Sequence, residues 1–427
     1  MIEHFLKEIK PAIQYVKHHK KVSKSFKEFY EDIYKMIVLF QKNQLKPKDK
    51  VGLFVLPYSY DFYVVMFASF LYQLNLVVFD SYKKNHINEL MILEEVRYCF
   101  VDRKTKMMSS FILPKCKKIN VSSFVKNKVN YNLKIESSSD SVILTTFTSG
   151  TTGTPKAIHR TIDFLLKQAK EIENEINLQD EFSIFGGLPI YNMLSLYLLK
   201  TTCISRKIKS IQKFQPDCIL TNIQKILSEK RSYPMVKKVM LGGAILYSEE
   251  VKKIKEVFPN ASITYVYGAS EGAIIYKTNL DFYQNNLFCF DKKANEIEVA
   301  ISNPNKDGVG EIVIKGDKVN TPNHLHYTGD LGKIVSGTLQ LLGRKKYSSL
   351  EKEFYNYAFD EEIRKKNLCM AFSFYYKNQI YVAYNGNLKN KKEGVEYIFM
   401  RQLPMDLKHK TKLNYKVCLD KIEKSMK

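Results

Sequence analysis

The stretch TSGTTGTPK, residues 148–156, follows directly after the apolar run VILTTF at residues 142–147. Every residue from Thr148 to Thr154 is Gly, Ser or Thr, so the segment offers uncovered backbone N–H groups and hydroxyl donors. Such a loop can wrap phosphate oxygens, and Lys156 adds a positive charge. The Walker spacing GxxxxGK(S/T) is missing, so a different type of phosphate loop is predicted. A Ser/Thr/Gly-rich surface turn is the alternative, which the length of the run disfavours.

Apolar periodicity on both sides of this loop predicts strands that alternate with helices. Short apolar runs bounded by turn residues are typical of buried strands, whereas apolar positions every three to four residues are typical of helices. This alternation predicts a parallel sheet covered by helices. Strands are expected at residues 50–56, 76–79, 142–147, 218–220, 236–241 and 262–268, and a strand followed by a turn at 183–190. Helices are expected at residues 25–45, 60–72, 161–176 and 247–257.

The pattern changes after about residue 288 to short alternating segments. The runs EIEVAI (296–301) and EIVIKG (311–316) are typical of antiparallel strands, and residues 332–344 of a hairpin. The predicted fold class is α/β, with a large N-terminal domain, 1–344, of parallel α/β subdomains plus a small antiparallel barrel-like part. A small, mobile α+β C-terminal domain is expected at residues 345–427.

The composition of the 427 residues favours a folded cytoplasmic protein without a membrane span. The most apolar stretch, residues 63–79, is too short and too polar to cross a bilayer, and the first residues lack the apolar core of a signal peptide. Seven cysteines without a CxxC pair predict free thiols in a reducing compartment. The net charge of +23 would suit nucleic acid or an anionic membrane. Because the lysines are scattered and no nucleic-acid motif accompanies them, a solvated basic surface without a nucleic-acid partner is favoured.

TSGTTGTPK resembles the phosphate-loop signature of the adenylate-forming (AMP-binding) enzymes, which include acyl-CoA synthetases, luciferases and peptide-synthetase adenylation domains. The resemblance extends from about residue 25 to 416 and is most specific in this loop. It implies that the loop holds the phosphates of ATP, with Thr148 in a catalytic role. The other loop residues that it implies as ATP ligands are Ser149, Gly150, Thr151, Thr152, Gly153 and Lys156.

Two further motifs follow in the order that this family shows. YGASE, residues 267–271, resembles the family's YGxTE, with Ser270 in place of Thr. The resemblance implies that the ring of Tyr267 stacks on adenine, because a flat ring stabilises a flat base, and that the catalytic Glu271 helps to hold Mg²⁺. The turn GGA resembles the family's adenine-side turn, where small residues let the backbone approach the base. The remaining nucleotide contacts implied by these motifs are Gly242, Gly243, Ala244, Gly268 and Ser270.

HYTGD, residues 326–330, resembles the family's aromatic-x-TGD motif. A carboxylate can accept two hydroxyl hydrogen bonds, so Asp330 is implied as the ligand of the ribose diol. Arg344 resembles the arginine that contacts ribose and phosphate at the end of the large domain. Lys346 falls at the family's hinge position, around which the small domain rotates between half-reactions.

The segment LPMDLKHKTKLNYK, residues 403–416, resembles the family's catalytic-lysine motif in two possible alignments. The form PxxxxGK would place the catalytic lysine at Lys410. A variant form, PxDxRHNxK, found in some fatty-acid-directed members and in β-lactone synthetases, would place it at Lys412. The variant is favoured because more positions match it, namely Pro404, Asp406, Lys408, His409 and Lys412.

The resemblance implies an AMP-forming acid–thiol ligase that uses ATP and Mg²⁺. A carboxylic acid, fatty or aryl, would become an acyl-adenylate with release of pyrophosphate, and the acceptor would be CoA or the phosphopantetheine of an acyl carrier protein. An amino acid is disfavoured because FGGLPIYNML, residues 185–194, contains no acidic residue for an α-amino group. The segment KKYSSLEKEF, residues 345–354, lacks the family's mobile glycine loop, which puts the thioester step in doubt. A weakened nucleotide- or acyl-adenylate-binding protein and a β-lactone synthetase are therefore the alternatives.

Overall fold

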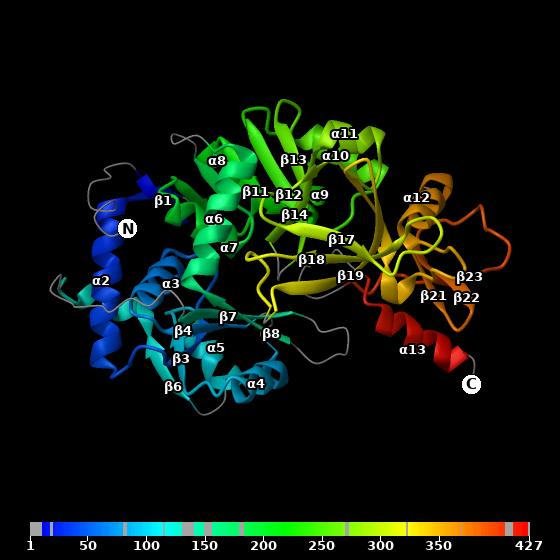
Figure 1. The fold of residues 1–427 in the computed structure, drawn as a ribbon. Helices are drawn as coiled ribbons and strands as arrows, with labels where there is room; N and C mark the ends of the chain where they lie inside the picture. Colours follow the sequence, from blue (N-terminus) through cyan, green and yellow to red (C-terminus); the bar gives the residue numbers. More distant parts are fainter. Residues whose placement is uncertain are drawn as a thin grey trace. The chain divides into compact units, whose positions relative to one another are not determined.

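The computed structural model describes residues 11–17, 20–79, 83–113, 116–129, 141–148, 156–178, 183–269, 273–321, 323–367, 369–405 and 413–425. The chain forms two compact units, residues 1–220 and 221–427 (Figure 1). The boundary predicted between residues 344 and 345 lies inside the second unit and stays a prediction. In the part of the chain that is described, no helix is long and apolar enough to cross a membrane.

A six-stranded sheet organises one half of the first unit, in the order β6–β5–β3–β4–β7–β8. All neighbours are parallel except the last pair, β7 and β8, which are antiparallel. Helices α2 and α3 contact each other, and so do α4 and α5. The bounds are α2 Phe26–Lys42, β3 Lys50–Phe54, α3 Tyr60–Leu71, β4 Asn75–Val78, α4 Lys84–Leu93, β5 Tyr98–Val101, α5 Thr105–Ile112, β6 Lys117–Asn120, β7 Val142–Thr148 and β8 Lys156–Thr161.

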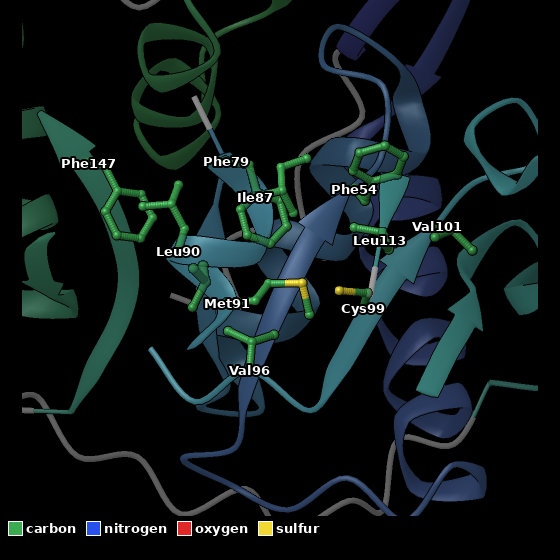
Figure 2. Close-up of a cluster of buried hydrophobic side chains, with 11 residues drawn as sticks. Phe54, Phe79, Ile87, Leu90, Met91, Val96, Cys99, Val101, Leu113 and Phe147 are labelled. Carbon is green, nitrogen blue, oxygen red and sulfur yellow. The ribbon is translucent and has the colours of Figure 1, made fainter. Parts of the chain in front are cut away.

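A buried apolar cluster joins this sheet to α4 and to the end of α5 (Figure 2). Its members come from strands β3, β4, β5 and β7 and from helix α4 with the turns that follow α4 and α5. A side chain on Gly52 would fit poorly, because an added Cβ would lie 2.8 Å from the sulfur of Cys99 and from the ring of Phe79. The cluster consists of Phe54, Val77, Phe79, Ile87, Leu90, Met91, Val96, Cys99, Val101, Leu113 and Phe147.

The second sheet of this unit has the order β11–β9–β10–β1–β2. Parallel pairing joins β11 to β9, β9 to β10 and β10 to β1. The edge strand β2 is antiparallel to β1. The bounds are β1 Pro11–Lys17, β2 Lys20–Ser25, α6 Ile162–Ile176, β9 Ile184–Gly186, α7 Pro189–Tyr197, β10 Thr202–Ile204, α8 Ile211–Phe214 and β11 Cys218–Asn222.

The second unit contains three sheets or parts of sheets. Strands β12 and β13 are parallel, and β14 and β16 continue antiparallel beside β13. An antiparallel sheet has the order β15–β20–β19–β18–β17. A smaller, mixed sheet has the order β21–β22–β23, in which β21 and β22 are antiparallel and β22 and β23 are parallel. The bounds are α9 Ile223–Leu227, β12 Lys238–Gly242, α10 Ser248–Val257, β13 Ser262–Ala269, β14 Ala273–Asn279, α11 Leu280–Asn285, β15 Cys289–Phe290, β16 Lys292–Lys293, β17 Glu298–Ser302, β18 Gly310–Lys315, β19 Leu325–Val335, β20 Thr338–Arg344, α12 Asn356–Asn367, β21 Met370–Tyr376, β22 Gln379–Asn385, β23 Val395–Phe399 and α13 Tyr415–Ser425.

The predicted fold class is confirmed, with parallel strands and helices early in the chain, an antiparallel five-stranded sheet after residue 288 and an α+β region at the end. Helix α2 begins within one residue of its predicted start. A capping box fixes this start, because the Ser25 hydroxyl accepts a hydrogen bond from the Glu28 N–H and the Glu28 carboxylate accepts one from the Ser25 N–H. One segment differs from the prediction. Strand β8 lies directly before helix α6, where no strand was predicted. The hairpin β1–β2 and the elements α4, β5 and α5 were not predicted either.

Candidate functional site

The centre of the site in the second unit is an ion pair between neighbouring antiparallel strands. Asp330 on β19 and Arg344 at the end of β20 are register partners, and Arg344 Nε lies 2.9 Å from Asp330 Oδ1. The Asp330 side chain is 9% exposed, whereas that of Arg344 is 34% exposed. The Asp330 carboxylate raises the pKa of Arg344, so the guanidinium stays charged. A buried carboxylate thus has a fixed cationic partner that still reaches solvent.

Tyr267 contacts the same carboxylate from strand β13. Its hydroxyl donates a hydrogen bond to Asp330 Oδ2 at 2.9 Å. Burial raises the pKa of Tyr267 well above its ordinary value, and the negative charge of Asp330 raises it further. The phenol therefore stays neutral and acts as a donor. The structure brings together Tyr267, Asp330 and Arg344, as the family resemblance implies.

The part of strand β19 just before Asp330 is held from several sides. The Thr328 hydroxyl donates to the Ile312 carbonyl at 2.9 Å and accepts the Asp330 N–H at 3.1 Å. Arg344 Nη1 donates to the Thr328 carbonyl at 3.1 Å. Gly329 has a φ of +73°, a conformation that favours glycine. These contacts account for each residue of the TGD motif. Thr328 binds through its hydroxyl, Gly329 adopts a backbone conformation that favours glycine, and Asp330 pairs through its carboxylate.

The GGA turn ends strand β12 next to β13. An added Cβ on Gly242 would lie 2.7 Å from the Val266 carbonyl oxygen, so this glycine permits close strand packing. Gly243 has a φ of +91°, and nothing lies within 4 Å of where its Cβ would be. The backbone at Gly243 is therefore open to an approaching ligand, as a base-binding turn requires.

Two buried tyrosines hydrogen-bond to backbone carbonyls in and just after this turn. Neither was identified from the sequence. The Tyr265 hydroxyl donates to the Ala244 carbonyl at 2.6 Å, and the Tyr283 hydroxyl donates to the Leu246 carbonyl at 2.8 Å. Their rings meet edge to face with centroids 4.7 Å apart, and both contact Phe290. The signal was present for Tyr265, because residues two apart on a strand share a face and Tyr267 was already a candidate.

The segment after Arg344 is fixed to helix α12. Asn356 Oδ1 accepts hydrogen bonds from the Arg344 N–H at 3.0 Å and from the Ser348 hydroxyl at 3.1 Å. The predicted hinge residue Lys346 lies in a short 3₁₀ helix, Lys345–Tyr347. The neighbouring Tyr347 ring stacks on Tyr415 of α13, with centroids 3.6 Å apart. The family's hinge position is thus bounded by contacts to two helices of the C-terminal region.

The predicted phosphate loop falls in the sequence between the antiparallel strands β7 and β8. Thr148 ends β7 and pairs through the backbone with Lys156, which begins β8. Several predicted site residues lie outside the described residues: Ser149, Gly150, Thr151, Thr152, Gly153, Ser270, Glu271, Lys410 and Lys412.

The region predicted to face the acid has its polar groups engaged within the first unit. Asn192 on α7 accepts the Gly186 N–H at 3.0 Å and donates to the Tyr63 hydroxyl at 2.8 Å. An added Cβ on Gly186 would lie 2.2 Å from Asn192 Oδ1, so glycine is required at this approach. Burial raises the pKa of Tyr191 to about 12, which keeps this neighbouring phenol neutral.

Among the described residues, no three His, Cys, Asp or Glu side chains come together as a metal site. Both oxygens of Asp330 already have protein partners, Tyr267 and Arg344. Glu271, the predicted Mg²⁺ ligand, has the hard oxygen donors that Mg²⁺ prefers. The family resemblance implies that the phosphates of ATP would supply further oxygen ligands to the same ion.

Two curated relatives match part of the chain. VraA of Staphylococcus epidermidis, provisionally named a long chain fatty acid-CoA ligase, is 26% identical over 225 residues, covering 47% of this chain and 49% of that protein. A 2-succinylbenzoate–CoA ligase of the same species is 27% identical over 199 residues, covering 42% of this chain and 41% of that protein. The matched part of the chain thus spans about half the length of these curated relatives.

Solved structures share the fold over nearly the whole chain. O-succinylbenzoate coenzyme A synthetase from Bacillus subtilis, in complex with AMP, has a TM-score of 0.79 at 17% identity and covers 96% of both chains. ATP-bound MatB from Rhodopseudomonas palustris has a TM-score of 0.82 at 14% identity and covers 100% of this chain and 99% of its own. Residues 7–321 match the family model described as AMP-binding enzyme. The resemblance inferred from TSGTTGTPK is confirmed, and the chain belongs to the AMP-binding enzyme family.

Proposed function

We propose that the protein activates a carboxylic acid, fatty or aryl, with ATP, forming an acyl-adenylate and releasing pyrophosphate. The acyl group then passes to the thiol of CoA or of a carrier-protein phosphopantetheine. The observation that carries the proposal is the Tyr267–Asp330–Arg344 arrangement in a chain of the AMP-binding family. It combines an aromatic ring, a carboxylate and a partly exposed cation, which suit a base, a diol and a phosphate.

The Asp330 carboxylate retains the capacity to bind a ribose. An ionised carboxylate has about four lone-pair sites, and the structure shows Tyr267 and Arg344 each using one. One lone pair on each oxygen can therefore accept a ribose hydroxyl. The open backbone at Gly243 offers the base an approach that a side chain would block.

The chemical step joins two anions. A carboxylate oxygen of the acid attacks the α-phosphorus of ATP, the new O–P bond forms, and the bond to the bridging oxygen breaks as pyrophosphate leaves. Cationic side chains and N–H donors must offset the charge that develops, and this is the role proposed for Lys412 and for the 148–156 loop. Holding the two reactants in line supplies much of the remaining rate enhancement. Mg²⁺, held with the help of Glu271, would supply further charge neutralisation of the triphosphate.

The substrate class follows from the side chains near residues 185–194. This segment offers no carboxylate to an ammonium group, and Asn192 is occupied by the Gly186 N–H and Tyr63. An acid without an α-amino group is therefore preferred. The names of the two staphylococcal relatives refer to a long chain fatty acid and to 2-succinylbenzoate, which represent the two acid classes proposed.

A second candidate function is acyl-adenylate formation or binding without thioester formation. It is motivated by the segment 345–354, which contains no glycine and is tied to α12 through Ser348 and Asn356. A β-lactone product from a β-hydroxy acid is the narrower form of this candidate, motivated by the PxDxRHNxK-like tail.

The deciding experiment measures pyrophosphate release over a panel of fatty, aryl, β-hydroxy and amino acids, with mass spectrometry of the products. Each acid is tested with CoA, with a phosphopantetheinylated carrier protein and with neither. The proposal expects release with fatty or aryl acids and an acyl thioester when a thiol is present. Adenylate or β-lactone without thioester would support the enzymatic form of the second candidate. ATP binding without pyrophosphate release for every acid would favour its binding-only form and refute the enzymatic assignments.

A further inference from the structure

Helices α4 and α5 carry an unusual share of exposed apolar side chains. Among the described residues, the three most exposed large apolar side chains are Ile92, Met107 and Phe111, at 78%, 75% and 74%. Leu93 and Met108 lie beside them in sequence, at 53% and 42%. These five residues form what we call the α4–α5 apolar patch. Single exposed apolar residues are ordinary, but five gathered on two contacting helices mark an interaction surface.

Helix α5 has its polar and apolar faces reversed relative to an ordinary surface helix. Thr105 and Ser109 are 1% and 0% exposed, whereas Met107 and Phe111, one turn apart, face outward. The Thr105 hydroxyl donates to the Phe54 carbonyl at 2.7 Å and accepts the Asp102 N–H at 2.9 Å. These bonds fix the rotation of the helix, so it cannot turn to bury its methionines. The outward apolar face is therefore built into the fold.

The topology places the apolar ends of both helices at the same edge of the sheet. Strands β4, β3, β5 and β6 are all parallel, α4 connects β4 to β5, and α5 connects β5 to β6. Both helices thus run opposite to the strands and end where the strands begin. Ile92 and Leu93 are the last residues of α4, and Phe111 lies in the last turn of α5. Helix α4 and the end of α5 pack on the buried cluster of Figure 2, and the residues of the patch are on the exposed side of these helices.

The charges around the patch are mostly positive. The segment 103–113 contains no acidic residue, and Arg103, Lys104 and Lys106 are exposed. At the edge where the helices end, the exposed cations are Arg97, Lys117 and Lys118. The exposed acids nearby are Glu89 and Glu95, whereas Glu94 is buried and paired with Lys50 at 3.0 Å. Cations therefore outnumber acids in the described surroundings of the patch.

We propose that the α4–α5 apolar patch docks the protein on an anionic lipid surface. The apolar side chains would enter the boundary between headgroups and acyl chains, while the surrounding lysines and arginines contact the phosphates. A bilayer accepts protruding apolar side chains without matching pockets, which favours it over a protein partner. The proposal does not depend on the acid or the acceptor of the proposed reaction.

The test is binding of the full chain to sedimented vesicles, either phosphatidylcholine alone or phosphatidylcholine with phosphatidylglycerol. The double variant Met107→Ser/Phe111→Ser removes two apolar anchors, and Lys104→Gln/Lys106→Gln removes two cations. Matched controls are Val335→Ser/Phe399→Ser and Lys306→Gln/Lys352→Gln, which alter exposed residues elsewhere. Circular dichroism of each variant verifies folding, and pyrophosphate release with a water-soluble acid reports the activity separately.

The wild type is expected to bind the anionic vesicles, and added salt should weaken this binding. The apolar variant should bind at least tenfold more weakly. The charge variant should lose roughly 25-fold, at about fivefold for each cation. The controls should match the wild type. Absence of binding to anionic vesicles, or equal binding by patch and control variants, would overturn the proposal. A patch variant that alters only the oligomeric state would also overturn it, since a second copy would then cover the surface.

Discussion

Asp330 and Arg344 face each other across strands β19 and β20, and their side chains form an ion pair with Nε and Oδ1 2.9 Å apart. A register shift between Leu331 and Gly332 follows immediately. Irregularities of this kind re-aim side chains at the end of a ladder. The pair is therefore preorganised by the backbone, so nucleotide binding need not assemble it.

Replacing Asp330 by Asn should weaken ATP binding strongly. The change removes the charge that pairs with Arg344 and weakens the acceptor proposed for the ribose. Hydrogen bonds to charged groups contribute about 1.5–3 kcal/mol, so kcat/KM for ATP should fall roughly 10- to 100-fold. Steady-state kinetics with Asp307→Asn, an exposed acid in the same unit, provide the control. An unchanged KM for ATP in Asp330→Asn would remove Asp330 from the nucleotide site.

Tyr267 is predicted to act through both its hydroxyl and its ring. Tyr267→Phe removes the hydrogen bond to Asp330 and should raise KM for ATP by about tenfold or less, as expected for a net contribution near 1 kcal/mol. Tyr267→Ala also removes the ring and should cost more. In an Asp330→Ala background, which lacks an acceptor for the phenol, the effect of Tyr267→Phe should nearly vanish, because the two residues share one interaction. Fully additive effects would show that the hydroxyl acts elsewhere.

The buried Asp360 should make stability depend on pH. It accepts hydrogen bonds from the Tyr247 hydroxyl at 2.9 Å and from the N–H and hydroxyl of Ser373 at 2.5 Å. Burial nevertheless raises its pKa to about 7. The folded chain thus binds more protons than the unfolded chain between about pH 4 and 7. The free energy of unfolding contributed by this group should fall as pH rises through that window, by a few kcal/mol at most.

Urea unfolding of the wild type and of Asp360→Asn, followed by circular dichroism from pH 4 to 8, measures this effect. The variant carries no titrating group at this position, so the difference between the two unfolding free energies isolates Asp360 from its neighbours Glu250, Glu361 and Arg364. As pH rises, the unfolding free energy of the wild type should fall relative to that of Asp360→Asn. The difference should become constant above about pH 7. Parallel pH profiles for the two proteins would contradict the prediction.

The two tail lysines should differ in their contribution to the adenylation step. Lys412→Ala should remove most acyl-adenylate formation, roughly 10²–10³-fold, because transition-state charge loses its partner. Nucleotide affinity, measured by calorimetry, should change little. Lys410→Ala is the matched control and should stay near wild-type activity. The reverse pattern would show that the alternative alignment of the tail is correct.

The sequence predicted most elements whose apolar pattern is long and regular. Helix α2 and the strands β3, β12 and β13 begin or end within two or three residues of their predicted bounds. Strand β8 was missed because its sequence, KAIHRT, contains only two adjacent apolar residues and therefore shows no strand periodicity. Only its pairing with β7 reveals the strand. Helix α5 escaped for a related reason: its buried residues are Thr105 and Ser109, which no apolar periodicity would select.

The sequence names candidate site residues but does not give the contacts between them. The motifs identify Tyr267, Asp330 and Arg344, yet they do not say that the phenol donates to the carboxylate. That bond depends on how β13 and β19, separated by about sixty residues in sequence, are packed in the second unit. The tyrosines beneath the GGA turn were missed for the same reason, since their hydroxyl partners are backbone carbonyls with no sequence signature.

The central claim is that the protein forms an acyl-adenylate. Acid-dependent exchange of labelled pyrophosphate into ATP tests it most directly, because exchange requires adenylate formation to run in both directions and needs no thiol acceptor. Wild-type protein with a fatty or aryl acid should show exchange, and Asp330→Asn should reduce it at limiting ATP. A protein that binds ATP but shows no exchange with any acid in the panel would contradict the account.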